Sequence, residues 1–240
     1  MNYRNLFFIV SAVVGSGLLL IPYDLQFLEF NSFISFISIF ILFLFIGNMM
    51  TKIDLSIFKF IEKNLGKYVG ISSGLLYWFI QSISTIILIS EFSRYFSRIF
   101  IALADYNIET QIAVVVFFFF FNLVSKNNQK LELVISLLKI LPLIILPVLC
   151  FFSRDFNLMK LQSEISIEKI YFGMPKIVLC FLGFEFAAII PKNKENSKTF
   201  ITGMFIVFSI YFLNLLGIFG VMGYKISSYT CYSDLMKYLF

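Results

Sequence analysis

Apolar segments long enough to cross a membrane alternate with short polar stretches along almost the whole chain. The hydrocarbon core of a bilayer is about 30 Å thick, and an α-helix needs about 20 apolar residues to span it. About seven such segments can be recognised, at residues 6–22, 33–50, 68–92, 112–124, 133–152, 171–190 and 200–223. This pattern predicts an all-α integral membrane protein in contact with the lipid bilayer.

Glycines interrupt two of these segments. Gly15-Ser16-Gly17 falls inside residues 6–22, and Gly183-Phe184-Glu185 falls inside residues 171–190. A break at bilayer depth is tolerated only beside protein or a polar cavity, and paired glycine-interrupted helices indicate the substrate site of a secondary transporter. The first break would present backbone N–H groups that attract a carboxylate, and the second could hold an amine. The alternative is flexible glycine packing without a ligand.

Two charged residues lie within the apolar segments. Glu185 is about midway along residues 171–190, where a carboxylate costs roughly 2.5 kcal/mol or more unless it is used or paired. It suits proton coupling or gating, and the alternative is an acid that reaches an interface. Lys139 follows the start of residues 133–152. It is either an interfacial lysine or a desolvated amine with a function.

Residues 68–92 carry a stripe of polar side chains. Tyr77, Gln81, Ser84 and Thr85 are spaced by three or four residues, so they share one face of a helix. This face must meet a cavity or another helix, and ordinary hydrogen bonding between helices is the alternative to a ligand.

Two linkers have apolar residues at helical spacing between polar ones, at residues 52–67 and 157–170. Each is expected to be either an amphipathic helix on the membrane surface or a solvated loop.

Composition narrows the classes of function. The chain of 240 residues is 60% hydrophobic and 14% charged, with a mean hydropathy of +0.91, which excludes a soluble domain. The net charge is +5. The sequence contains no basic patch with interleaved aromatic residues, so it does not indicate a nucleic-acid partner. The chain has no histidine and three scattered cysteines, and no nucleophile–base motif appears. An enzyme, a metal site and a bound cofactor are therefore not expected.

The cationic residues predict the orientation. Loops on the side of the N-terminus hold more lysine and arginine than those on the other side, roughly ten against seven. By the positive-inside rule the N-terminus is cytoplasmic, in a multi-pass protein of the cell inner membrane.

Several motifs together resemble the amino acid–polyamine–organocation (APC) permease family, across nearly the whole chain. The motifs are Val14-Gly-Ser-Gly17 followed by Leu-Leu-Leu-Ile-Pro22, Asn64-Leu-Gly-Lys-Tyr-Val-Gly70, Leu76-Tyr-Trp78, Lys139-Ile-Leu-Pro142, Phe181-Leu-Gly-Phe-Glu185 and the basic Pro191–Lys198. Each motif is weak alone, but their order and spacing match the family's helices 1, 3, 5 and 6. Arginine/agmatine-type antiporters are the most similar subgroup.

The resemblance implies a LeuT-type fold of two inverted five-helix repeats. Residues 1–153 would be the first repeat, and residues 154–240 the first two helices of an incomplete second repeat. The chain would transport amino acids or related amines, by antiport or proton coupling.

The resemblance also implies the roles of residues. Gly15, Ser16 and Gly17 would hold the substrate carboxylate, with Gln81, Thr85, Gly183 and Phe184 completing the site. Glu185 would pair with Tyr77 in a pH-sensitive gate, and Lys139 would replace a sodium ion.

The chain departs from the family pattern at three points. Leu179 stands where a gate aromatic is expected, which argues against arginine-like selectivity. The usual proline- and glycine-rich segment between helices 2 and 3 is absent. Helices 8 and 10, which usually complete the pathway, have no counterpart in the 240 residues. The alternatives are therefore a non-functional remnant, or a transporter that depends on a second polypeptide for the missing helices or on a homodimer.

Overall fold

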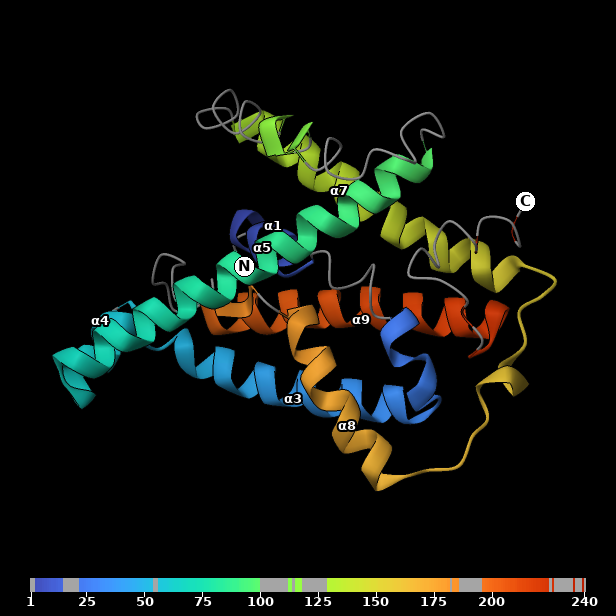
Figure 1. The fold of residues 1–240 in the computed structure, drawn as a ribbon, viewed down its shortest axis with the longest axis horizontal. Helices are drawn as coiled ribbons and strands as arrows, with labels where there is room; N and C mark the ends of the chain where they lie inside the picture. The colour runs from blue at the N-terminus through green and yellow to red at the C-terminus, as the bar shows by residue number, and fades with distance from the viewer. Residues whose placement is uncertain are drawn as a thin grey trace. The chain divides into compact units, whose positions relative to one another are not determined.

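The computed structural model describes residues 3–14, 22–53, 56–99, 112–113, 115–117, 129–181, 183–185, 196–224, 226, 235 and 239. Every regular element among these residues is helical (Figure 1). The chain divides into two compact units, Met1–Ile57 with Leu138–Phe240, and Phe58–Leu137. Interlocked repeats need not form separate compact units, so the predicted division at residue 153 stays a prediction.

The first unit contains the longest buried helices. Its α-helices are α1 (Tyr3–Val13), α3 (Asn31–Met50), α8 (Ile167–Val178), α9 (Asn196–Met222) and the larger part of α7 (Gln129–Phe152). Residues 22–25 are also helical, and single 3₁₀ turns occur at η1 (Gln26–Leu28), η3 (Leu158–Leu161) and η4 (Leu179–Phe181).

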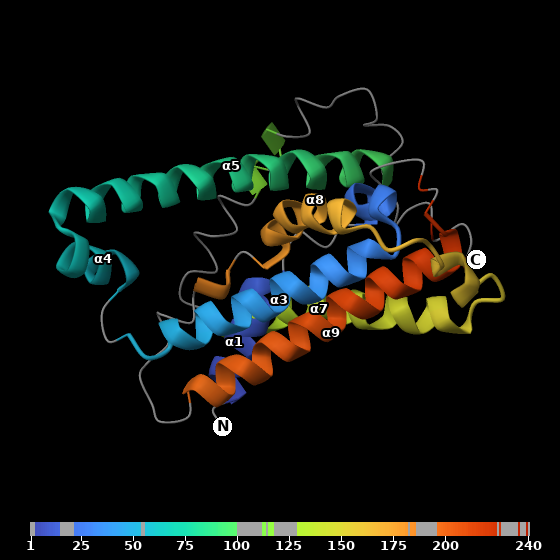
Figure 2. The ribbon, with the colours of Figure 1, turned by 90° about the horizontal axis from the view of Figure 1, so that it is seen from below.

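Helices α3 and α9 run side by side through this unit (Figure 2), α8 packs on α3, and α1 packs on α9. Phenylalanines fill the interface between α3 and α9. The rings of Phe40 and Phe208 stack with 4.3 Å between their centroids, and Phe36 contacts Phe208 and Phe181. Phenylalanine rings of α3, η4 and α9 thus form part of the core of the first unit.

The second unit contains α4 (Ile57–Leu65) and α5 (Lys67–Ile99). Gly66 joins them with a φ of +92°, and its N–H donates to the Glu62 carbonyl at 3.0 Å. A left-handed residue that caps a helix in this way is usually glycine. The helical alternative for residues 52–67 is therefore confirmed, while its position on a membrane surface stays a prediction.

The linker at residues 157–170 is not one continuous helix. It contains η3 and the first turn of α8, and residues 162–166 between them are not helical. Its polar groups bind to neighbouring elements instead: the Asn157 N–H donates to the Gly220 carbonyl at 2.9 Å, and the Asn31 amide donates to the Glu164 carbonyl at 3.0 Å. The Tyr224 hydroxyl donates to the Leu161 carbonyl at 2.9 Å, and burial, with the nearby Glu29 carboxylate, raises the pKa of Tyr224 to about 12. The linker therefore crosses the ends of α3 and α9 and is hydrogen-bonded to both.

Within the described residues, three helical segments are long and apolar enough to cross a membrane, at Asn31–Met50, Lys67–Ile86 and Ser197–Met222. The apolar part Ile140–Phe152 of α7 is shorter, and the predicted span at residues 112–124 lies largely outside the described residues. The prediction of an all-α protein with membrane-spanning helices is confirmed at this level. The number of seven spans stays a prediction.

Candidate functional site

The helix predicted at residues 171–190 is interrupted where its glycine stands. Helix α8 ends at Val178, one 3₁₀ turn follows at η4, and Gly183 then has a φ of +103°. A side chain is disfavoured in this left-handed conformation, whereas glycine adopts it freely. Gly183 therefore permits a change of chain direction inside an apolar segment.

Gly183 lies directly against the end of α1. A β-carbon at residue 183 would be only 2.5 Å from the Ala12 carbonyl oxygen and 3.3 Å from the Val13 Cα. Helix α1 ends at Val13, immediately before the predicted break at Gly15-Ser16-Gly17. Those three residues lie outside the described residues. The contact nevertheless brings the interruption after α8 next to the residue at which α1 stops.

Glu185 turns back onto the backbone of this interruption. The Gly183 N–H donates to Glu185 Oε2 at 2.8 Å, and the Glu185 residue is 8% exposed. The carboxylate therefore accepts a bond that satisfies a buried donor. Phe184 packs on Phe43 of α3, with 4.4 Å between ring centroids. The predicted residues Gly183, Phe184 and Glu185 thus lie together, with Gly183 and Glu185 buried and Phe184 partly buried.

Tyr211 of α9 completes the group and was missed by the sequence analysis. Its hydroxyl donates to the Val13 carbonyl at 2.9 Å, and the residue is 1% exposed. Its ring lies beside Phe181 in η4, at 6.0 Å between centroids. A hydroxyl within the apolar residues 200–223 was the available signal, but its partner is 198 positions away in sequence.

A second polar residue of α9 serves the proline-containing helix α7. Pro147 lies inside α7 and has no N–H to offer the Leu143 carbonyl four residues earlier. Asn214 Nδ2 donates to that carbonyl at 2.6 Å and to the Ile210 carbonyl at 2.7 Å. These two contacts fix the orientation of the amide, and Asn214 Oδ1 is buried without a hydrogen-bond partner.

Other predicted site residues lie on α5 or outside the described part. Tyr77, Gln81 and Thr85 are on α5 in the second unit, where Tyr77 packs on Phe58 at 5.4 Å between centroids. The Thr85 hydroxyl donates to the Gln81 carbonyl of its own helix at 2.8 Å. Lys139 lies in α7, and its side chain is outside the described part. The pairing of Tyr77 with Glu185 stays a prediction.

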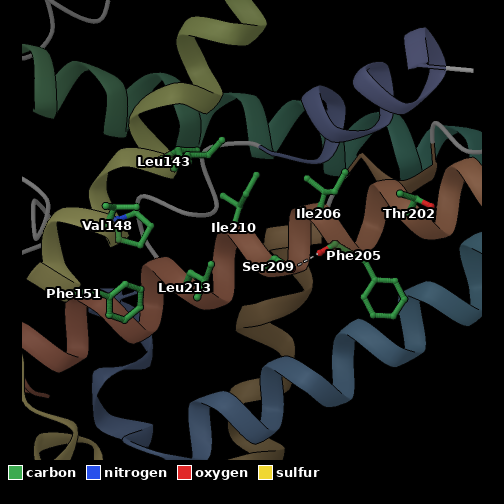
Figure 3. A pocket seen from close by; sticks show the side chains of 11 residues that line it. Leu143, Val148, Phe151, Thr202, Phe205, Ile206, Ser209, Ile210 and Leu213 are labelled. Atoms are coloured by element: carbon green, nitrogen blue, oxygen red, sulfur yellow. Dashed lines mark hydrogen bonds between the residues drawn. The ribbon is translucent and has the colours of Figure 1, made fainter.

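The first unit has a groove between α7 and α9 (Figure 3). Its volume is about 440 Å³, and apart from Thr202 and Ser209 its lining side chains are hydrocarbon. The Ser209 hydroxyl donates to the Phe205 carbonyl of its own helix. The groove offers no charge to a zwitterion, so the segment at residues 179–185 remains the better candidate site.

The candidate site has no metal-binding character. Across the part of the chain that the structure describes, no three histidine, cysteine, aspartate or glutamate side chains gather in a way that could hold a metal ion.

No protein-family model, curated protein or solved structure matches the chain.

Proposed function

We propose that the chain is a secondary transporter of amino acids or related amines, of the APC type, with its substrate site between the end of α1 and residues 179–185. Gly15, Ser16 and Gly17 hold the substrate carboxylate in this proposal. Gly183 and Phe184, with Gln81 and Thr85 of α5, contact the rest of the substrate. Glu185, Tyr77 and Lys139 serve gating or coupling to protons.

The observation that carries the proposal is the contact of Gly183 with Ala12 and Val13. The irregular backbone at Gly183 lies against the last residues of α1 inside a bundle of apolar helices. Irregular backbone is tolerated at membrane depth where it lines a cavity or contacts protein. In transporters, half-helix ends of this kind bind the charged ends of a substrate.

The proposed architecture is the LeuT-type arrangement, with about seven spans and a cytoplasmic N-terminus in the cell inner membrane. Three membrane-length helices, and two shorter helices that end at Val13 and Val178, support it. A second polypeptide or a second copy of the chain is part of the proposal as a partner in transport.

Transport by the reconstituted protein tests the proposal. The purified chain is placed in proteoliposomes, alone and together with a polypeptide supplying helices 8 to 12 of a related permease. Uptake of labelled amino acids, and their exchange against an internal pool, is expected in the second preparation. A complete assembly that moves no amino acid or amine in either mode would contradict transport and favour a non-functional remnant.

A further inference from the structure

We infer that Tyr211 is a positioning residue for the substrate site: it fixes the end of α1 against the interrupted segment that follows α8. This inference rests on the proposed function, because it concerns the same site. It concerns a residue on α9, a helix to which the sequence analysis assigned no site residue. The evidence is a hydrogen bond, a ring contact and a close backbone approach, all within the first unit.

The hydrogen bond joins α9 to the last residue of α1. In an uninterrupted α-helix the Val13 carbonyl would accept from the N–H of residue 17. Here it accepts from the Tyr211 hydroxyl at 2.9 Å, in a buried position. A buried carbonyl needs a partner, especially where no water is available. Tyr211 therefore ties α9 to the last residue of α1.

The ring of Tyr211 contacts the other side of the site. Its centroid is 6.0 Å from that of Phe181 in η4 and 6.3 Å from that of Phe36 in α3. Two residues after Phe181, Gly183 lies against the Ala12 carbonyl. The Val13 carbonyl thus accepts from Tyr211, while the adjacent Ala12 carbonyl packs closely against Gly183.

The end of α1 consequently has two independent attachments, and Gly15-Ser16-Gly17 begins two residues beyond it. A shift of Val13 moves the start of these three residues directly. The Tyr211 hydroxyl bonds to the backbone of α1, so its proposed role is to set the position of α1. Loss of its hydroxyl should weaken substrate binding more than it affects insertion.

The experiment compares Tyr211→Phe with two controls in the full chain, complemented as in the transport assay. Ser209→Ala removes a hydroxyl from the same helix, but that hydroxyl bonds only to its own helix at Phe205. Tyr171→Phe removes a phenolic hydroxyl from a side chain on α8 that is 75% exposed. Affinity for the transported amino acid is measured by equilibrium binding. A single cysteine replacing Ser16, in a chain without native cysteines, reports labelling rates without substrate.

Tyr211→Phe is expected to lower affinity about fivefold to tenfold, the effect of one net hydrogen bond, and to change the labelling rate at residue 16. Both controls should match the parent chain. Equal affinity and equal labelling in Tyr211→Phe would overturn the inference while leaving transport intact. A parent chain that binds no amino acid would instead overturn the proposed function. In that case, an unchanged labelling rate at residue 16 in Tyr211→Phe would still refute the positioning role of Tyr211.

A second variant tests the inference in case Tyr211→Phe does not fold. Phe181→Leu keeps the hydroxyl and removes the ring contact with Tyr211, together with the ring contacts to Phe36, Phe40 and Phe43. It is expected to change affinity and labelling in the same direction by a smaller factor. No change in a folded Phe181→Leu protein would contradict the role of Tyr211 in joining the two segments.

Discussion

The interrupted segment after α8 and the polar face of α5 both attract attention in the sequence, but they use their polar groups differently. At the interruption, Gly183 contacts α1 and the Tyr211 hydroxyl reaches a carbonyl 198 positions away. On α5, the hydroxyls of Ser73, Ser82, Ser84 and Thr85 each donate to a carbonyl four residues earlier in the same helix.

This difference shows which sequence signals specify a site. A serine or threonine in an apolar helix can satisfy itself by bonding back to its own helix, so a polar stripe requires no partner. A glycine with a left-handed φ and a backbone neighbour at contact distance does require a particular tertiary arrangement. The interruption therefore carries more information about the site than the stripe on α5.

The largest expected effect follows from Gly183→Ala. The new β-carbon would overlap the Ala12 carbonyl oxygen, and a left-handed alanine costs about 1–2 kcal/mol by itself. Overpacking adds roughly 1–3 kcal/mol. Thermal unfolding in detergent should show a strong destabilisation and substrate binding should be lost.

Gly66→Ala is the matched control for Gly183→Ala. Gly66 also has a positive φ, of +92°, but a β-carbon there meets nothing within 4 Å. It should show only the backbone strain. Equal destabilisation by the two variants would mean that the contact with α1 contributes nothing.

A smaller effect is expected where α9 supports α7. Asn214→Leu leaves the Leu143 carbonyl without its donor, which should cost about 1–3 kcal/mol of unfolding free energy. Pro147→Ala restores an N–H that can bond this carbonyl within α7. In the Pro147→Ala background the cost of Asn214→Leu should therefore fall markedly. A double-mutant cycle measures the difference, and strict additivity would refute the link between the two residues.

Glu185→Gln should change the response to pH more than it changes stability. The glutamine amide keeps an oxygen that can accept from the Gly183 N–H, but it cannot bind or release a proton. In the proposed role of proton switch, the carboxylate makes substrate affinity depend on pH, and Glu185→Gln should lose this dependence. Tyr77→Phe is the companion variant for the predicted gate. A parental pH profile in Glu185→Gln would show that the carboxylate is only structural.

The smallest effect on stability is expected on α5. Thr85→Val removes a hydroxyl that bonds only to its own helix at Gln81 in the structure, so the unfolding free energy should change by no more than about 0.5 kcal/mol. Thermal unfolding beside Ser73→Ala, another hydroxyl bonded within α5, provides the comparison. A loss above about 1 kcal/mol in Thr85→Val alone would show that α5 has a stabilising polar partner at this position.

Long apolar runs made several helices predictable. Helices α3 and α9 begin and end within a few residues of the predicted segments, because bilayer-length hydrophobicity leaves few other structures. The interruption at Gly183 was also predictable from its residue type. The linker at residues 157–170 was ambiguous, because its apolar spacing fits a helix while its polar groups bind α3 and α9 instead.

The hydrogen bonds that α9 makes to α7 and α1 could not be predicted from the local sequence. Asn214 and Pro147 are each visible as exceptions in apolar segments, but only the fold pairs the amide with the carbonyl that proline leaves open. The same holds for Tyr211 and Val13. Each pair joins residues of two different helices, so it can be recognised only once the packing of those helices is known.

Ligand-induced stabilisation of the purified, complemented protein tests the substrate site most directly. A ligand that binds the folded state raises the unfolding free energy by RT ln(1 + [L]/Kd). At least one zwitterionic amino acid should raise the melting temperature, whereas its analogues lacking the carboxylate or the amine should not, and Gly183→Ala should abolish the shift. A folded protein whose melting temperature responds to no amino acid or amine, or responds equally in Gly183→Ala, would contradict a substrate site where α1 meets residues 179–185.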